Sequence, residues 1–546
     1  MDEASPRPRL TRVADALFTA RTLQGAGIAH PDRPDRLLRA GLALRRWGPT
    51  PAAGYAASAA RTPDRTAIDD ELGTVTFAAL DRRTNALARS LREAGVGEGD
   101  GVGILARNHR GFVESTVACS KLGANALYLN TAFAGPQVTD VVARERPAAL
   151  IHDEEFTELC AEASRGRPTF LAWEEGSGGG GSSRPPTLED LIDAGAPRRL
   201  RPPSRPGKVV ILTSGTTGAP KGASRRQPDS LAPAAALLSK IPLRAREPTM
   251  IAAPLFHSWG FAHFTLGLAL SSTLVLRRRF DPRETLAAIA RTRATGLVVV
   301  PVMLERILEL GEAAIAEHDL DDLRVIAASG SALPGELATR VLDRFGDVLY
   351  NLYGSTEVAW VTIATPADLR AAPGTGGRPP RGTTVRLYDD GDQPVPDGET
   401  GRIFVVNELL FEGYTGGGGK DVIDGLMSTG DVGHFDEDGR LFIDGRDDEM
   451  IVSGGENVFP REVEDLLSGH PEIEAAAAIG VPDERFGQRL KAFVVRAAGS
   501  ELGEEAVKRH VKENLAGYKV PGEVVFVEEL PRNATGKVVK RELAEL

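Results

Sequence analysis

The chain has 546 residues, of which 42% are apolar and 26% charged, as expected of a soluble globular protein with two or more domains. Its formal net charge of −11 argues against non-specific nucleic-acid binding, which needs a basic surface. With only Cys119 and Cys160, it has neither a disulfide framework nor a cysteine-based zinc site, which predicts a reducing, cytoplasmic location.

Two helices are predicted at the start of the chain, at residues 10–23 and 36–47. Apolar residues of the first recur at the 3.6-residue helical period. The second combines four arginines with four leucines, so it could lie on a membrane surface as a peripheral contact. Alternatively, it packs on its own domain while the arginines extend into solvent. Residues 1–50 are therefore predicted to form a helical extension.

Apolar runs then alternate with helical patterns between residues 67 and 149, and again around 208–213, 296–301 and 324–329. This alternation predicts an α/β fold with parallel-rich sheets. The glycine-rich segment 174–186 is predicted to be a flexible linker. Residues 258–276 are long enough to span a bilayer, but they contain His263 and several hydroxyls, so a buried helix followed by a strand is preferred.

The character of the chain changes after about residue 445, where a small α/β unit with its own strand and helix patterns begins. The predicted domains are therefore a large N-terminal domain over residues 51–447 and a small, mobile C-terminal domain over residues 448–546. A unit of about 100 residues is an ordinary domain size.

One stretch raises a specific chemical question: LTSGTTGAPKGAS, residues 212–224, follows an apolar run. Its glycines allow backbone N–H groups to converge on an anion, its hydroxyls can donate further hydrogen bonds, and Lys221 adds positive charge. The order differs from a Walker A loop, in which the lysine directly precedes Ser or Thr. Taken alone, such a loop is a surface turn about as often as a phosphate site.

Four further motifs follow this loop in a characteristic order, and together they resemble the adenylate-forming superfamily, most closely its fatty acyl-CoA synthetases. The resemblance runs from about Pro63 to the C-terminus. It implies ATP, Mg²⁺ and coenzyme A as cofactors or substrates. The five motifs are TSGTTGAPKG (213–222), NLYGSTE (351–357), STGD (428–431), GRDDEMIVSGGENVFPREVE (445–464) and NATGKVVKREL (533–543).

The resemblance implies a role for each motif in the attack of a carboxylate on the α-phosphate of ATP, where two anions must approach one another. Lys537, Thr356 and Glu357 are the expected catalytic residues, with Glu357 holding Mg²⁺. Tyr353 is expected beside the adenine and Asp431 on the ribose. The expected nucleotide-binding residues are Thr213, Ser214, Gly215, Thr216, Thr217, Gly218, Lys221, Ser329, Gly330, Ser331, Tyr353, Gly354, Asp431 and Arg446.

Each of these residues also has a purely structural interpretation. Tyr353 could be a core aromatic residue, Glu357 an acid at a helix start, and Asp431 a turn former. Lys537 could be one solvated lysine beside Lys540. The ordered set of motifs favours the functional interpretation.

Relatives use one cleft for two half-reactions by swinging the small domain, and the resemblance places that hinge at Asp448. Ser453, Gly454 and Gly455 would then line the passage for the pantetheine chain of coenzyme A, since glycine permits close approach to the backbone.

The acid is expected to bind in an apolar pocket. No carboxylate occurs between Met250 and Phe280, so an amino-acid substrate, whose ammonium needs a partner, is disfavoured. A medium- or long-chain fatty acid is expected, and an aryl or branched acid, or transfer to a carrier protein, is the alternative. The Gly-rich segment 413–420, with Lys420, departs from the family pattern. The expected pocket residues are His257, Trp259, Gly260, Ala359 and Trp360.

Overall fold

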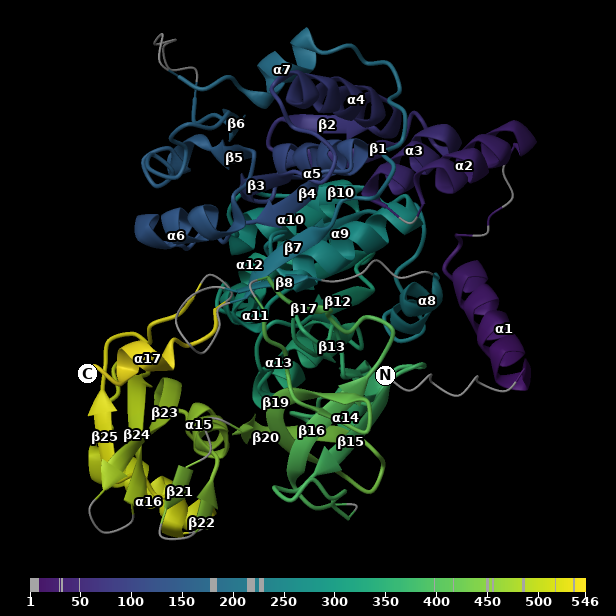
Figure 1. Ribbon diagram of the computed structural model, residues 1–546. Coiled ribbons are helices and arrows are strands. Elements are labelled where there is room, and N and C mark those ends of the chain that lie inside the picture. The colour runs from purple at the N-terminus through teal and green to yellow at the C-terminus, as the bar shows by residue number, and fades with distance from the viewer. Residues whose placement is uncertain are drawn as a thin grey trace.

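The computed structural model describes most of the chain, and its described residues form four β-sheets flanked by helices (Figure 1). Two large sheets fill the upper part of the view, a third lies below them, and the fourth forms the C-terminal unit at the lower left. The described residues are 9–28, 30, 33–48, 50–176, 184–213, 221–224, 230–396, 398–415, 417–447, 451–453, 456–483, 487–515, 517–533 and 536–546.

The largest sheet has eight strands in the order β14-β13-β12-β11-β9-β10-β1-β2, of which the six from β13 to β1 run parallel. Its central strands are buried on both faces and read as continuous apolar runs, as expected of a parallel sheet covered by helices. The strands are β1 (Thr66–Asp70), β2 (Gly73–Thr76), β9 (Thr249–Ile251), β10 (Leu274–Leu276), β11 (Gly296–Val299), β12 (Val325–Ala328), β13 (Leu349–Tyr353) and β14 (Thr362–Ala364).

A second sheet has seven strands in the order β17-β8-β7-β4-β3-β5-β6, parallel from β7 to β6. Strand β7 leads into the glycine-rich loop, and β8 returns antiparallel to it. The strands are β3 (Gly101–Leu105), β4 (Asn125–Tyr128), β5 (Ala149–Asp153), β6 (Thr169–Trp173), β7 (Val209–Thr213), β8 (Lys221–Ser224) and β17 (Gly413–Tyr414).

The two remaining sheets have five strands each. The third, antiparallel throughout, contains β15 (Thr384–Tyr388), β16 (Gly401–Val406), β18 (Val422–Ile423), β19 (Leu426–Phe435) and β20 (Leu441–Arg446). The fourth contains β21 (Ile451–Ser453), β22 (Glu456–Val458), β23 (Ile473–Asp483), β24 (Gly487–Arg496) and β25 (Glu523–Phe526).

The helices cover the faces of these sheets. Stretch 258–276 folds as a largely buried helix followed by a strand, as the sequence predicts. The helices are α1 (Arg9–Gly25), α2 (Pro34–Trp47), α3 (Pro51–Arg61), α4 (Phe77–Glu93), α5 (Arg110–Leu122), α6 (Gly135–Glu145), α7 (Leu188–Ala194), α8 (Ala232–Leu238), α9 (Ser258–Leu270), α10 (Pro282–Thr292), α11 (Pro301–Leu308), α12 (Gly311–Ala316), α13 (Gly335–Phe345), α14 (Pro366–Ala371), α15 (Pro460–Ser468), α16 (Glu504–Asn514) and α17 (Lys540–Leu543).

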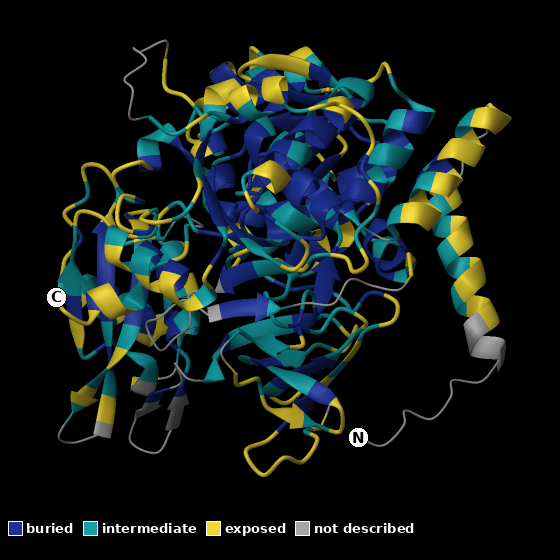
Figure 2. Cartoon of the chain, turned by 45° about the horizontal axis from the view of Figure 1, so that its top comes forward, coloured by how far each residue is buried: buried dark blue, intermediate teal, exposed yellow. Residues whose placement is uncertain are grey.

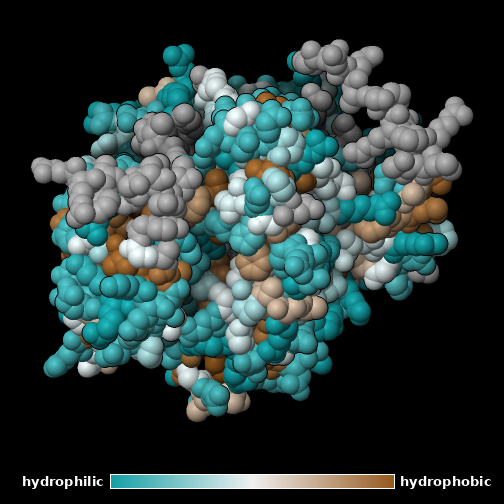
Figure 3. Space-filling view, turned by 90° about the horizontal axis from the view of Figure 1, so that it is seen from below, coloured by the Kyte–Doolittle hydropathy of each residue, from teal (hydrophilic) through white to brown (hydrophobic). Residues whose placement is uncertain are grey.

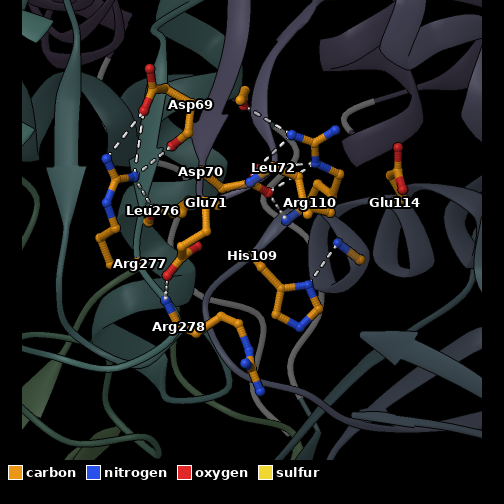
Figure 4. Close-up of polar contacts among 12 residues, drawn as sticks. Asp69, Asp70, Glu71, Leu72, His109, Arg110, Glu114, Leu276, Arg277 and Arg278 are labelled. Atoms are coloured by element: carbon orange, nitrogen blue, oxygen red, sulfur yellow. Dashed lines mark hydrogen bonds and ion pairs between the residues drawn. The ribbon is translucent and has the colours of Figure 1, made fainter. Parts of the chain in front are cut away.

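A buried ion-pair network ties the two parallel sheets together (Figure 4). The carboxylate of Asp70, at the end of β1, accepts from Arg110 Nη2 at 2.5 Å and from the Arg110 backbone N–H at 2.9 Å, at the start of α5. Neighbouring Asp69 lies 3.4 Å from Arg277 Nη1, just after β10. A buried carboxylate is tolerable only when it is paired and hydrogen-bonded, so the Asp70–Arg110 contacts fix how the two sheets meet. The Asp69–Arg277 pair joins neighbouring strands of one sheet.

The hydrophobic cores separate the chain into a large unit and a small C-terminal unit, as the predicted domains require. One extended core joins the two parallel sheets, and the C-terminal sheet has separate cores of its own from Ile451 onwards (Figure 2). The predicted fold class, a large parallel-rich α/β domain followed by a small α/β domain, is confirmed. The exact boundary stays a prediction, since residues 448–450 lie outside the described part.

The surface seen from below is mainly hydrophilic, with apolar residues in separate patches (Figure 3). Across the described ranges, no helix is both long and apolar enough to cross a membrane. Helix α2 packs against α3, with Ala40 buried and Trp47 against the main core, as the second interpretation expects. Four of its leucines are nevertheless exposed: Leu37, Leu38, Leu42 and Leu44.

Candidate active site

The candidate site lies where the parallel strands of the largest sheet end. Because β9, β11, β12 and β13 are parallel, the residues that follow them meet at one edge of the sheet, the usual position of ligand crevices in α/β folds. Three predicted segments follow these strands directly: residues 254–260 after β9, Ser329–Ser331 after β12 and Gly354–Glu357 after β13.

Tyr353, Asp431 and Arg446 form one hydrogen-bonded chain. The Tyr353 hydroxyl donates to Asp431 Oδ2 at 2.5 Å, and Arg446 Nη1 lies 3.3 Å from Asp431 Oδ1. Asp431 and Arg446 are direct neighbours across β19 and β20. Burial raises the pKa of Asp431 against the opposing effect of Arg446, and burial also raises the pKa of Tyr353, which therefore stays protonated as a donor.

Lys537 approaches these hydrogen-bonded residues from the C-terminal domain. Its charge is close enough to Asp431 to oppose the rise in the pKa of that carboxyl. The Lys537 backbone N–H donates to Asn533 Oδ1 at 3.0 Å, which closes the loop that carries it. Gly536, in the same loop, packs against Val302 on α11 of the large domain. The structure thus brings the predicted lysine and the predicted aspartate together.

Glu357 is held by two hydroxyl donors. Tyr414 donates to Glu357 Oε1 at 2.9 Å, and Ser355 donates to Oε2 at 2.9 Å. Over the described segments, no group of three or more His, Cys, Asp or Glu side chains could hold a metal ion. A single oriented carboxylate still fits Mg²⁺, which usually binds through one or two carboxylates, waters and substrate phosphates.

Thr356 connects the motif after β13 to the start of α9. Its hydroxyl lies 2.8 Å from that of Ser258, the first residue of the helix. His257 is the N-cap residue of the same helix, although its side chain makes no capping hydrogen bond. The helix start, where backbone N–H groups point outward, is therefore adjacent to the predicted catalytic threonine.

Two histidines stand at this end of α9: His263 is buried and His257 is half-buried. Burial lowers the pKa of both His257 and His263 to about 4, so both imidazoles are neutral at pH 7. His263 Nδ1 lies 3.2 Å from the carbonyl oxygen of Trp259. The Nε2 atoms of both have no hydrogen-bond partner among the described residues. A neutral, apolar environment suits an uncharged acyl group better than an ammonium.

Two of the predicted pocket residues have clear structural roles. Trp259 is buried and donates from Nε1 to the carbonyl oxygen of Val299 at 3.0 Å. A Cβ at Gly260 would lie 2.3 Å from the carbonyl oxygen of Pro254, so only glycine allows α9 to approach that turn. Both contacts fix the position of the first turn of α9.

The segment after Glu357 makes a tight turn that requires glycine at Gly354, where a Cβ would lie 2.2 Å from the carbonyl oxygen of Ala359. Ala359 itself has a φ of 63°. The indole of Trp360 donates to Thr383 at 3.0 Å and lines a small cavity that also contacts α1 and α8. His257 is not among the described residues that line this cavity.

Several predicted residues lie outside the described part of the chain: Ser214, Gly215, Thr216, Thr217 and Gly218 of the glycine-rich loop, Asp448, Gly454 and Gly455. The backbones at the two ends of the loop are described, and Thr213 pairs with Lys221 across β7 and β8. Ser453 pairs with Gly487 where β21 meets β24 in the C-terminal sheet. The proposed roles of all these residues stay predictions.

Three residues at the site had no predicted role in the sequence analysis. Tyr414 and Ser258 contact Glu357 and Thr356, as described above. Lys420 Nζ lies 3.5 Å from the carbonyl oxygen of Thr429, beside the turn that carries Asp431. Tyr414 and Lys420 come from the glycine-rich segment that departed from the family pattern, so that segment contributes to the site.

A large parallel-rich α/β domain followed by a small α/β domain is the arrangement expected of the adenylate-forming superfamily. The chain belongs to the AMP-binding enzyme family: residues 55–415 match the AMP-binding enzyme family and residues 462–537 match the AMP-binding enzyme C-terminal domain. The sequence-based prediction of the superfamily is therefore confirmed.

Individual relatives match nearly the whole chain. Feruloyl-CoA synthase of an Amycolatopsis species is 35% identical over 493 residues, covering 88% of this chain and 96% of the relative. Indoleacetate–CoA ligase of Aromatoleum aromaticum is 34% identical over 490 residues, covering 89% and 95%. The structure of o-succinylbenzoate CoA synthetase from Bacillus subtilis with its acyl-adenylate has a TM-score of 0.79 at 26% identity, covering 90% and 97%.

These relatives are named for aromatic acids. They do not support the prediction that this chain stands closest to fatty acyl-CoA synthetases, and they favour the aryl-acid alternative. The apolar segment from which a fatty acid was inferred does not distinguish an alkyl chain from an aromatic ring, since both require a pocket without charges.

Proposed function

We propose that this protein is an ATP-dependent acid–CoA ligase that activates an aromatic carboxylic acid as its acyl-adenylate and then transfers the acyl group to coenzyme A. The observation that carries the proposal is that Lys537 of the C-terminal domain acts on the carboxyl of Asp431, to which Tyr353, from the same motif as Glu357, donates its hydroxyl hydrogen bond. Similarity to relatives named for aromatic acids supports the substrate class.

In the proposed reaction, the acid's carboxylate attacks the α-phosphorus of ATP, the bond to the bridging oxygen breaks, and pyrophosphate leaves. Lys537 would stabilise the negative charge that builds up between the two anions. Asp431 would accept from ribose hydroxyls while Tyr353 and Arg446 hold it in place. Mg²⁺ bound at Glu357 would neutralise phosphate charge.

The first test is pyrophosphate release with ATP and Mg²⁺ across benzoate, 4-hydroxycinnamate, ferulate, indoleacetate, octanoate and palmitate, with and without coenzyme A. Preference for the aromatic acids with CoA-dependent turnover is expected. Preference for palmitate would refute the aromatic assignment. Pyrophosphate release that stops near one turnover despite CoA would refute coenzyme A as the acyl acceptor and indicate a carrier protein instead.

The second test separates the half-reactions. Lys537→Ala is expected to slow adenylate formation by about 100- to 1,000-fold, the range for loss of one transition-state donor, and to leave thioester formation from preformed adenylate intact. Lys540→Ala is the matched control, because Lys540 Nζ is already paired with Glu464 at 3.0 Å. Equal loss of both steps in Lys537→Ala would refute its assigned role.

A further inference from the structure

Helix α1 lies outside both regions that match the family and stands at the edge of the molecule against α8 (Figures 1 and 2). Its contact with the rest of the protein is thin. Val13 and Leu17 are 57% and 53% exposed, so these apolar side chains do not anchor it in a core. A helix held by so little buried apolar area can separate from its neighbours at low cost.

One cavity lies between α1 and the large domain. It is lined by the apolar side chains of Trp360, Pro233 and Ala236 together with the polar side chains of Arg381 and Asn407. An apolar lining with a few polar groups is the usual feature of a small-molecule site. An aromatic ring that carries a hydrogen-bonding substituent matches this distribution.

The cavity is within reach of the predicted catalytic residues. Asn407 Nδ2 donates to the carbonyl oxygens of Val358 and Trp360 at 2.8 and 2.9 Å, which fixes the segment after Glu357 against the cavity. Trp360 is three residues beyond Glu357, so their Cα atoms are at most about 11 Å apart. The short segment after Glu357 therefore also lines the cavity, through Trp360.

Helix α1 closes this cavity through one arginine. Arg381 Nε donates to Asp15 Oδ1 at 3.0 Å, and the Arg381 guanidinium carbon lies 4.7 Å from the centre of the Phe18 ring. Asp15 and Phe18 both line the cavity. The Asp15 carboxylate and the Phe18 ring thus contact the same Arg381 guanidinium that a polar aromatic ligand would contact.

From these contacts we infer that α1 is a displaceable cover over the far end of the acid site, and that the Asp15–Arg381 pair is its latch. Acids whose aromatic ring carries a polar group lift the cover by taking over Arg381, whereas short acids leave it closed. The inference rests on the proposed function for its ligand, but the latch itself is a property of the free protein.

The cover can be observed without turnover by attaching bimane to Ala20→Cys, one residue after Thr19, which lines the cavity with Trp360. The native thiols do not compete, because burial raises the pKa of both Cys119 and Cys160 to about 12. Trp360 is expected to quench bimane emission while the cover is closed. In Trp360→Phe the emission of the closed state should therefore increase.

Asp15→Asn is expected to raise bimane emission with no ligand present. Asp322→Asn, which breaks a separate exposed pair with Arg293, is the control and leaves emission unchanged. Adding 4-hydroxycinnamate to the parent protein is expected to raise emission, while benzoate does not. Unchanged emission in Asp15→Asn overturns the latch, and emission indifferent to 4-hydroxycinnamate overturns the ligand assignment.

Kinetics provide an independent test. Asp15→Asn is expected to lower the KM for 4-hydroxycinnamate by about 1.5- to 5-fold, the range for an exposed ion pair, without changing that for benzoate. Phe18→Ala acts in the same direction, and Leu17→Ala, on the exposed side of α1, is its control. Equal effects of Phe18→Ala and Leu17→Ala overturn the inference. Absence of pyrophosphate release with every acid refutes the proposed function, and the ligand-free emission still decides the latch.

Discussion

Gly536 is the position where a single methyl group is expected to separate the two half-reactions. It precedes Lys537 in the C-terminal domain, and a Cβ at this position would lie 2.4 Å from Val302 Cγ1 on α11. Its φ of 78° is also in the left-handed region. Gly536→Ala therefore adds backbone strain and a steric clash at the contact that places Lys537 beside Asp431.

The size of the effect follows from these two contributions. Alanine in the left-handed region costs about 1 kcal/mol, and overpacking a contact costs about 1–3 kcal/mol. Together they weaken the docked arrangement by about 2–4 kcal/mol, which corresponds to a loss in adenylation rate of about 30- to 1,000-fold. Val302→Ala removes the atom that clashes, so the double variant is expected to retain only the strain and to recover most of the loss.

The assay compares pyrophosphate release with thioester formation from preformed acyl-adenylate. The matched control is Gly499→Ala, because Gly499 has a similar φ of 81°, lies in the same domain and has open space within 4 Å of the place its methyl group would take. Adenylation is expected to fall in Gly536→Ala while thioester formation persists. The reasoning is refuted if Gly536→Ala behaves like Gly499→Ala, or if Val302→Ala brings no recovery.

Other residues give predictions that concern pH, metal and membrane. His263 takes up a proton only near pH 4, whereas an unfolded histidine does so near 6.5, so the free energy of unfolding decreases as pH falls through this window. His263→Leu is expected to reduce this decrease between pH 8 and pH 5 by about 2 kcal/mol, measured by urea unfolding. A decrease equal to that of the parent protein contradicts the prediction. Tyr414→Phe leaves Glu357 less well oriented, so half-saturating Mg²⁺ is expected to rise about tenfold or more, while an unchanged Mg²⁺ titration would remove the assigned role. Replacing exposed Leu38 and Leu42 by serine is expected to abolish sedimentation with anionic vesicles without affecting pyrophosphate release; wild-type protein that does not sediment shows the membrane prediction to be wrong.

The sequence was a reliable guide to elements whose signal is local. The buried strands β11 and β12 were visible as short apolar runs, and the helix and strand at 258–276 followed from length and composition. Motif order indicated which segments share a site, because residues after neighbouring parallel strands must meet at one edge. These inferences needed no knowledge of side-chain contacts.

Contacts between segments far apart in the sequence could not be predicted from local patterns. Tyr414 meets Glu357 across 57 positions of sequence, and nothing around Tyr414 except its glycines distinguishes it. Trp360 was expected to line the acid pocket, but nothing in the sequence indicated that its indole would donate to Thr383 or share a cavity with α1. The choice between a fatty and an aromatic acid likewise depends on cavity shape, which an apolar pattern does not encode.

In the proposed function, the position of Lys537 would let one site serve two reactions with opposite needs. Adenylation brings a carboxylate towards a triphosphate and requires an added positive charge, whereas attack by a thiol on the finished adenylate requires space and no such charge. Arg446 belongs to the large domain and remains beside Asp431, but Lys537 reaches it from the small domain through the Gly536–Val302 contact. Under the proposed function, undocking of the small domain would therefore remove this additional cation from Asp431, while Arg446 would stay beside it.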